Sequence, residues 1–408
     1  MDRLLRCVVA LVLAVVPAGL LAPSARAGTD GKWAPLAPGV GYRELTVRTP
    51  HGEARVYAVR ADLRQPGVRA DLLFPGAVAA RAPLTRLAGA RGAVAAVNGD
   101  FFDISEEQHP GVEATGAPSG PAVYRGRALK AAVPEAQRFG ERPPPGDDDR
   151  DVFGVGVDGV ARLDRLELDG RLWTPDGDHP LGGLNQYALP VGSIGAFTAD
   201  WGGASRARAV CGSDTSRADP CSTDTWEVTV RHDRVVSASP TPGGGPIPED
   251  STVLLGREAG ARVLAGLPLG TPVVVTHRLA ATRPVPLAFA LGAYPVLRGG
   301  RPVPGLDTTR AEPRTAVGLA GGGRVVVLLS TDGREGTSTG LTVAELARVV
   351  GDLGCRDGVF LDGGASATLA ARDPATGVLT VRNRLDHGRE RPVPNGIGLF
   401  AGTDRPSD

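Results

Sequence analysis

Lysine and histidine are scarce in this chain. Lys32 and Lys130 are the only lysines, so almost every basic side chain is an arginine, and only six histidines are present. The histidines are scattered, and the chain contains neither an H-E-x-x-H nor a C-x-x-C pair. The usual sequence signs of a zinc site and of a serine–histidine triad are therefore missing. We expect chemistry based on carboxylates, arginines, carboxamides and backbone amides, with no metal and no cofactor.

Other common signatures are absent as well. The sequence has no G-x-S-x-G elbow and no phosphate-binding G-x-x-x-x-G-K loop. Its 45 basic and 45 acidic residues balance, whereas a nucleic-acid partner usually requires a strongly basic face. We therefore expect no nucleic-acid partner. Because arginine is so frequent, a single arginine is weak evidence for a site.

The first 27 residues have the pattern of an export signal. Arg3 and Arg6 precede an apolar run over 8–22, and A-R-A at 25–27 fits the small-residue cleavage rule. The alternative is a membrane anchor, but the run is shorter than the roughly 20 residues that a bilayer requires, and Pro17 interrupts it. The sequence predicts a signal peptide over 1–27, a secreted chain, and no stable membrane insertion after cleavage.

The four cysteines are few enough to consider singly. Cys7 lies in the predicted signal peptide. Cys211 and Cys221 flank a polar, turn-rich loop, and an exported chain meets oxidising conditions, so we predict a disulfide between them. Cys355 is left single near the end of a predicted helix, where a buried structural thiol is the expected state.

Strand patterns predominate over helical ones. Glycine (57) and proline (35) are frequent, as in a chain with many turns. The predicted strands cover 42–49, 54–61, 68–74 and 271–280, and two hairpins cover 225–239 and 315–333. We expect an α+β fold with a β-rich, mixed, twisted sheet and few helices. The expected divisions are 28–82 as an N-terminal β-rich segment, 83–402 as the main domain and 403–408 as a tail.

The strongest helix signal lies near the C-terminus. Thr342 and Glu345 form a capping box, and apolar residues follow at helical spacing over 342–354. Strand patterns at 324–330 and 358–362 enclose this helix, which predicts one βαβ unit with a parallel crossover. Asp362 would then lie at the carboxyl end of a parallel strand, where ligands gather.

A similar arrangement occurs earlier in the chain. A helical stretch at 83–92 and a strand at 93–97 precede Asn98, so two strand ends could line one cleft. Irregular insertions cover 104–150 and 200–225, and such insertions are usually functional or disordered. The aspartate run at 147–149 is interpreted as a solvated loop, with a calcium site as the alternative.

Five polar stretches occur where core sequence would be expected to continue. They are AVNGDFFD (96–103), EPRTAVG (312–318), LLSTDGREGTSTGLT (328–342), FLDGGASATL (360–369) and ERPVPNGIGLF (390–400). In this order and spacing, from about residue 90 to 402, the chain resembles the phosphodiester glycosidase family. Two positions depart from the family pattern, because Asp100 replaces a small residue and Ala365 replaces a glycine.

The resemblance implies hydrolysis of a sugar from a glycosyl-1-phosphodiester, with a phosphodiester-linked glycan or glycolipid as the substrate. It makes Arg314 a candidate phosphate fork, Asp362 the carboxylate near the anomeric carbon, and Asn98 a ligand of sugar hydroxyls or phosphate. The glycine-turn amides could add anion contacts. The remaining predicted substrate-binding residues are Gly363, Gly364, Ser366, Thr315, Asp332, Arg334 and Arg391.

Each of these residues has a structural alternative. Asp-Gly-Gly and Asn-Gly are also common turn sequences, and serine or threonine in a turn often satisfies backbone groups. Two other functions remain open at this stage: a non-catalytic wall protein that binds glycan or phosphate, and an ordinary glycosidase with two carboxylates facing one cleft.

Overall fold

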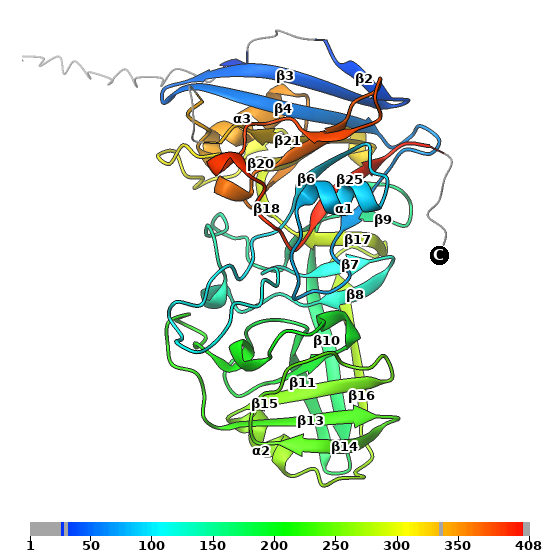
Figure 1. Ribbon diagram of the computed structural model, residues 1–408, viewed down its shortest axis with the longest axis vertical. Helices are drawn as coiled ribbons and strands as arrows, with labels where there is room; N and C mark the ends of the chain where they lie inside the picture. Colours follow the sequence, from blue (N-terminus) through cyan, green and yellow to red (C-terminus); the bar gives the residue numbers. More distant parts are fainter. Residues whose placement is uncertain (1–25, 28–31, 334–337, 403–408) are drawn as a thin grey trace, which may run out of the picture.

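The computed structural model describes residues 26–27, 32–333 and 338–402 (Figure 1). The predicted signal peptide, apart from Arg26–Ala27, the tail at 403–408 and Arg334 lie outside these residues. The described chain forms three sheets and is elongated, with the N- and C-terminal strands in the upper half of Figure 1 and the middle of the chain in the lower half. The α+β prediction, rich in strands and poor in helices, is confirmed.

The upper sheet joins the two ends of the chain. β3 (Val40–Thr49) and β4 (Gly52–Asp62) continue through β21 (Val325–Thr331), β20 (Thr315–Ala320), β22 (Asp357–Leu361) and β18 (Tyr294–Arg298). The short strands β1 (Arg26–Ala27), β2 (Ala34–Ala37) and β19 (Arg301–Pro302) lie at its edges. The predicted strands at 42–49 and 54–61 therefore share a sheet with C-terminal elements.

The helix α3 (Val343–Asp352) contacts β18, β20 and β22 of this sheet. Its predicted capping box is present: the Glu345 N–H donates to Thr342 Oγ1 at 3.2 Å, and the Thr342 N–H donates to Glu345 Oε2 at 2.8 Å. The predicted apolar face is buried against the sheet, because Leu346, Ala347 and Val350 belong to one buried cluster with Phe360.

The predicted βαβ unit is present with one difference. β21, α3 and β22 follow in order, but β20 lies between the two strands and pairs antiparallel with both. β21 and β22 are therefore parallel to each other, as the predicted crossover requires, but the strand that leads to Asp362 is paired with β20 and β18, which are both antiparallel to it. The reason is the hairpin at Gly321–Gly323, which returns β20 alongside β21 before the crossover begins. The register still places Thr315 opposite Ser330 and Leu361, so three strand ends meet at one rim.

A five-stranded sheet packs beside this rim. Its order is β24 (Leu379–Val381), β23 (Leu369–Arg372), β6 (Ala95–Asn98), β25 (Gly396–Phe400) and β5 (Arg69–Leu73). The predicted helix at 83–92 is α1 (Leu84–Ala90), which buries Leu84 and Leu87 in a cluster with Ala96 of β6. The strand predicted at 68–74 is confirmed as β5, although it leaves the sheet of β3 and β4.

The third sheet has 11 strands and forms the lower lobe of Figure 1. The long β10 (Ala161–Thr174) pairs with β9 (Asp151–Gly156), β11 (Gly177–Leu184) and β16 (Val274–Ala281). β11 and β12 (Ile194–Phe197) are parallel, which confirms a mixed sheet. The other strands are β7 (Ala122–Tyr124), β8 (Arg127–Lys130), β13 (Thr225–Arg231), β14 (Arg234–Ser239), β15 (Ser251–Arg257) and β17 (Leu287–Gly292), and α2 (Ala259–Ala265) packs on β13 and β15.

The hairpin predicted at 225–239 is confirmed as β13 and β14. His232 and Asp233 form its turn with φ values of 50° and 58°. Two adjacent residues with positive φ make the tight turn that matches the twist of antiparallel strands.

The two long insertions hold each other in place. The disulfide predicted between Cys211 and Cys221 is present. Beside it, the buried Arg208 guanidinium pairs with Glu106 and donates to Gln137 Oε1 at 3.1 Å. Within the described residues, no helix is both long and apolar enough to cross a membrane. Cys355 is single and buried, as predicted, and burial raises the pKa of its thiol to about 12.

The aspartates at 147–149 each have an arginine partner. Asp147 pairs with Arg298, Asp148 with Arg150, and the buried Asp149 with Arg138. Asp149 also accepts a hydrogen bond from the hydroxyl of Tyr294 at 2.7 Å. Because Asp149 is buried and paired, the solvated-loop interpretation is wrong for this residue, although its Oδ2 has no hydrogen-bond partner among the described residues. The calcium alternative stays a prediction.

Candidate active site

The candidate site lies at the rim where β22 ends, β20 begins and β6 ends. The backbone N–H of Asp362 donates to the carbonyl of Gly99 at 2.9 Å, and Asn98 Nδ2 donates to the carbonyl of Asp362 at 2.7 Å. The second of these bonds joins residues 264 positions apart in the sequence. The two strand ends that were expected to line one cleft are therefore in direct contact.

The side chain of Asn98 connects three segments beneath the rim. Its Oδ1 accepts from Thr315 Oγ1 at 2.7 Å and from the Thr368 N–H at 3.1 Å, while Nδ2 serves Asp362. Asn98 and Thr315 are both fully buried. These contacts make Asn98 and Thr315 positioning residues, since they hold the turn that carries Asp362. Their contact with a substrate stays a prediction.

The carboxyl group of Asp362 lies at the centre of the site. It is hydrogen-bonded to Ser366 and to the Gly363 N–H, and the positive charge of Arg391 is close enough to act on it. Arg391 Nη1 in turn donates to Ser366 Oγ at 3.3 Å. Burial outweighs these favourable contacts and raises the pKa of Asp362 to about 7. Such a carboxyl group can gain or lose a proton near neutral pH, as a catalytic group must.

The glycine turn after Asp362 serves packing. The Gly364 N–H donates to the Pro313 carbonyl at 2.8 Å, and a Cβ on Gly363 would lie 2.7 Å from that same oxygen. The Gly363 N–H donates to Asp362. Both amides are therefore engaged within the protein, and their contact with a substrate stays a prediction. Gly364 has a φ of 57°, whereas Ala365 avoids positive φ, as its replacement of a glycine requires.

Arg314 is buried close to Asp362. It immediately precedes Thr315, which is paired with Leu361, the residue before Asp362. Its Nε donates to the Leu341 carbonyl and its Nη2 to the Arg310 carbonyl, both at 2.9 Å. Its Nη1 pairs with Glu141 Oε1 at 2.5 Å. The predicted phosphate fork is thus rigidly oriented, but one arm is already occupied by a carboxylate.

Glu141 was not predicted from the sequence. It comes from the Pro-rich insertion, immediately before Arg142 and the three prolines at 143–145. Its charge acts on Asp362 as well and raises the pKa of that carboxyl group. Nothing in the local sequence distinguishes it from a solvated acidic residue, because its partner Arg314 lies 173 positions away.

Asp332 is bound by a different set of groups. Its Oδ1 accepts from the Arg384 N–H at 2.7 Å, and it is hydrogen-bonded to the hydroxyl of Tyr57. Burial, followed by the negative charge of Asp332, raises the pKa of Tyr57 to about 12. These contacts hold the end of β21 in place. Substrate binding by Asp332 stays a prediction. Arg334 lies outside the described residues.

A second buried charge pair lies behind the rim. Lys130 Nζ donates to the carbonyl oxygens of Ser119 at 3.1 Å and Gly120 at 2.5 Å, while Asp100 Oδ2 accepts from the Gly120 N–H at 2.7 Å. Burial raises the pKa of Asp100 and lowers that of Lys130, and the two charges oppose these shifts by stabilising each other. Asp100, which departs from the family pattern, thus has a compensating cation.

A cavity of about 490 Å³ adjoins the Arg314–Glu141 pair. Its lining combines apolar and charged side chains from the insertion, from the loop before β20, from α3 and from β22. Asp362 does not line it, but Phe360, two residues earlier, does. The volume is at the lower end of the range for small-molecule sites. The lining residues include Glu141, Pro143, Leu306, Arg310, Val343 and Phe360.

Residues 224–400 match the family model of the phosphodiester glycosidases. The matched segment is therefore similar in sequence to that family. It runs from β13 to β25 and contains Arg314, Asp362, Ser366 and Arg391. The resemblance inferred from the motifs is confirmed. Asn98 and Glu141 lie outside the matched segment and reach the site through the fold.

Two solved structures share the fold. A hypothetical protein from Synechocystis matches with a TM-score of 0.68 and 22% identity, over 93% of this chain and 64% of its own length. A protein of Burkholderia pseudomallei described as exported matches with a TM-score of 0.62 and 22% identity, over 85% and 74%. This chain thus spans less than two thirds of the Synechocystis protein. No curated protein sequence matches significantly.

The catalytic domain of zebrafish N-acetylglucosamine-1-phosphodiester alpha-N-acetylglucosaminidase also matches. The TM-score is 0.42 at 13% identity, over 94% of this chain and 89% of that domain.

Proposed function

We propose that this protein is a hydrolase that cleaves a sugar from a glycosyl-1-phosphodiester. The observation that carries the proposal is the convergence of Asp362, Ser366 and Arg391 at one rim, with Arg314 adjacent, in a segment that matches the family model of the phosphodiester glycosidases. A carboxyl group that titrates near neutral pH beside arginines suits a reaction that needs a carboxylate at a sugar carbon and cations at a phosphate.

The reaction breaks the bond between the anomeric carbon and a phosphate oxygen, and water supplies the new hydroxyl group. The departing phosphate is stable as an anion, so the demand for a general acid is small. The main requirements are to hold the phosphate and to stabilise positive charge at the anomeric carbon. We assign the first task to Arg314 with Arg391, and the second to ionised Asp362, acting as nucleophile, base or electrostatic stabiliser.

Glu141 is the second carboxylate of the site. Its Oε1 pairs with Arg314 Nη1, so an incoming phosphate would compete with Glu141 for that guanidinium. The same pairing supports the alternative function, a non-catalytic protein that binds glycan or phosphate on this scaffold. The reason is that an Arg314 already paired with Glu141 is less available to stabilise a departing phosphate. An ordinary glycosidase is a third reading, in which Asp362 and Glu141 would be the two carboxylates.

We further propose that the protein is exported and acts on cell-envelope or extracellular glycopolymers. The predicted signal peptide, the disulfide Cys211–Cys221 and the exported Burkholderia neighbour support export. Detection of the cleaved chain outside the cytoplasm, with an N-terminus at Gly28, tests this proposal. Accumulation of the uncleaved chain inside the cell would contradict it.

The activity is tested with chromogenic and lipid-linked sugar-1-phosphodiesters of several sugars. The expected products are free sugar and a phosphomonoester, and Asp362→Asn should abolish their release while the chain stays folded. Asp176→Asn, at an exposed turn, is the matched control and should keep full activity. Tight binding without turnover of any substrate would favour the binding-protein alternative, and equal rates on a phosphate-free glycoside would favour the ordinary glycosidase.

A further inference from the structure

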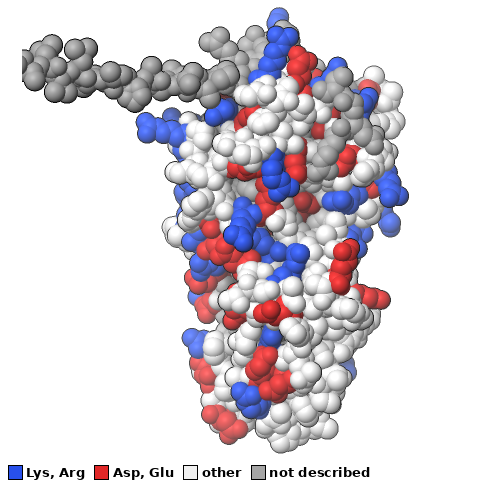
Figure 2. Space-filling view, turned by 90° about the vertical axis from the view of Figure 1, so that its left-hand side faces the viewer, with Lys and Arg blue, Asp and Glu red and all other residues white. Residues whose placement is uncertain are grey.

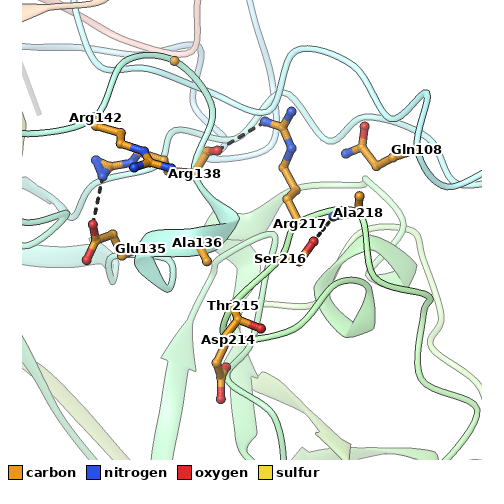
Figure 3. A pocket seen from close by; sticks show the side chains of 11 residues that line it. Gln108, Glu135, Ala136, Arg138, Arg142, Asp214, Thr215, Ser216, Arg217 and Ala218 are labelled. Atoms are coloured by element: carbon orange, nitrogen blue, oxygen red, sulfur yellow. Dashed lines mark hydrogen bonds and ion pairs between the residues drawn. The ribbon is translucent and has the colours of Figure 1, made fainter.

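A second and larger cavity lies outside the candidate active site. It has a volume of about 660 Å³ and lies between the insertion at 104–150 and the disulfide-closed loop at 211–221 (Figure 3). The insertion lies on the left of Figure 1, and Figure 2, which views that side, shows basic and acidic side chains crowded across its middle. Gly140 and Arg142 line both this cavity and the one beside Arg314 and Glu141. The two cavities are therefore neighbours separated by one turn of chain.

Two arginines of this cavity have no acidic partner. Among the residues that the structure describes, none forms an ion pair with Arg142, which is exposed. Arg217 is held differently: its Nη1 donates to the Arg138 carbonyl at 3.2 Å, and its guanidinium lies 3.7 Å from the ring centroid of Phe139. A stacked guanidinium with one bond to a neutral carbonyl keeps its charge and most of its N–H donors available.

The acidic residues in the lining are engaged elsewhere. Asp214 Oδ1 accepts from the Val191 N–H at 3.0 Å. Glu135 lies 3.5 Å from Arg138, whose charge is also neutralised by Asp149 at 3.0 Å. The lining therefore combines three guanidinium groups with two carboxylates, and the two guanidinium groups that form no ion pair with either carboxylate are those of Arg142 and Arg217.

The loop at 211–221, which forms the cavity wall opposite the insertion, is held in one conformation by covalent and hydrogen bonds. The disulfide closes it, and Ser213 Oγ accepts from the Ser216 N–H at 3.1 Å and donates to Asp219 Oδ2 at 2.5 Å. Gln137 Nε2 donates to the Ser213 carbonyl at 2.5 Å and so ties the wall to the insertion. A preorganised cavity binds a charged ligand without first ordering its own loops.

We propose that this cavity is an anion subsite, and that it binds a second phosphate on the leaving-group side of the substrate. The inference rests on the proposed function, which needs one phosphate at Arg314. Arg142 and Arg217 are cations beyond those assigned to that first phosphate, and Arg142 lines both cavities. The substrate class is then a glycosyl phosphate with at least two phosphate groups, such as a glycosyl pyrophosphate or a phosphodiester-repeat polymer.

Inorganic tripolyphosphate tests the subsite without relying on catalysis. Calorimetric titration of the full chain should show binding that weakens as salt is added. The double variant Arg142→Ala with Arg217→Ala should bind about tenfold or more weakly, as expected for loss of charge-assisted hydrogen bonds. The control is Arg301→Ala, at an exposed strand edge away from the cavity, which should bind like the wild type. Equal affinity in the double variant and wild type would overturn the proposal.

A kinetic comparison separates the subsite from the proposed function. With a glycosyl pyrophosphate ester, Arg217→Ala, which alters the second cavity alone, should raise KM about tenfold at unchanged kcat, whereas with a single-phosphate diester both constants should stay as in the wild type. An equal rise of KM for both substrates would refute a separate subsite. If neither substrate is hydrolysed but tripolyphosphate binding still depends on the two arginines, the proposed function fails and the subsite stands.

Discussion

The carboxyl group of Asp362 should weaken the fold at neutral pH, and Asp362→Asn should relieve that cost. Burial raises its pKa from an ordinary 3.8 to about 7. The folded state then holds a proton that the unfolded state releases between these values, so stability falls as pH rises from about 4 to 7. Each pKa unit corresponds to about 1.4 kcal/mol, which sets an upper bound of about 4 kcal/mol above pH 7.

Asparagine is neutral at every pH and nearly the same shape. Because it loses part of the hydrogen bonding from Ser366 and Gly363, we expect a net gain of about 1–3 kcal/mol in the free energy of unfolding at pH 8. At pH 4, where Asp362 is itself protonated, the gain should vanish. The variant should thus be inactive but more stable. Such an opposition between stability and activity is expected of a catalytic group.

Urea unfolding at pH 4 and pH 8 measures this difference directly for wild type, Asp362→Asn and the exposed control Asp176→Asn. The wild type and the control should show the same pH dependence. A variant that is less stable than wild type at pH 8, or a stability difference equal at both pH values, would refute the raised pKa and with it the buried character of the site.

Three further outcomes are expected. Glu141→Gln removes the charge that neutralises Arg314, so phosphate should bind more tightly in titration calorimetry while the free energy of unfolding falls by about 1–3 kcal/mol; unchanged phosphate affinity would mean that Glu141 does not compete for the fork. Gly363→Ala places a methyl group 2.7 Å from the Pro313 carbonyl, so it should displace the turn and lower kcat by at least an order of magnitude with a lower Tm, and wild-type kinetics would show that the turn tolerates movement. Cys211→Ser with Cys221→Ser opens the loop that walls the second cavity, so the free energy of unfolding should fall by about 2–3 kcal/mol and tripolyphosphate binding should weaken; tight binding without the disulfide would show that the wall is ordered by other contacts.

Local patterns predicted the elements that depend on neighbouring residues. The capping box of α3, the positive-φ turn at His232 and Asp233, and the disulfide between Cys211 and Cys221 all involve residues within about ten positions of each other. The order of five polar motifs also indicated the family whose model matches residues 224–400. Such features are readable because short-range geometry determines which side chains can meet.

Strand order was not readable in the same way. The sequence places β20 next to β21 in a hairpin, but it does not say on which side β22 is added. β20 lies between β21 and β22 and pairs antiparallel with both, so the strand that leads to Asp362 is parallel to β21 without pairing with it directly. Asp362 nevertheless lies at the rim of the sheet, because β20 begins where β21 and β22 end.

The sequence by itself determined which residues could carry the chemistry: Asp362 after a buried strand, and Arg314 within a family motif. Only the tertiary structure decided how they are engaged. It partly buries Asp362 and so raises the pKa of its carboxyl group, places the buried Asn98 beneath it, and brings Glu141, 173 positions away in the sequence, into contact with Arg314. The physical reason is that desolvation and ion pairing depend on distances through space, and long-range chain crossings set those distances.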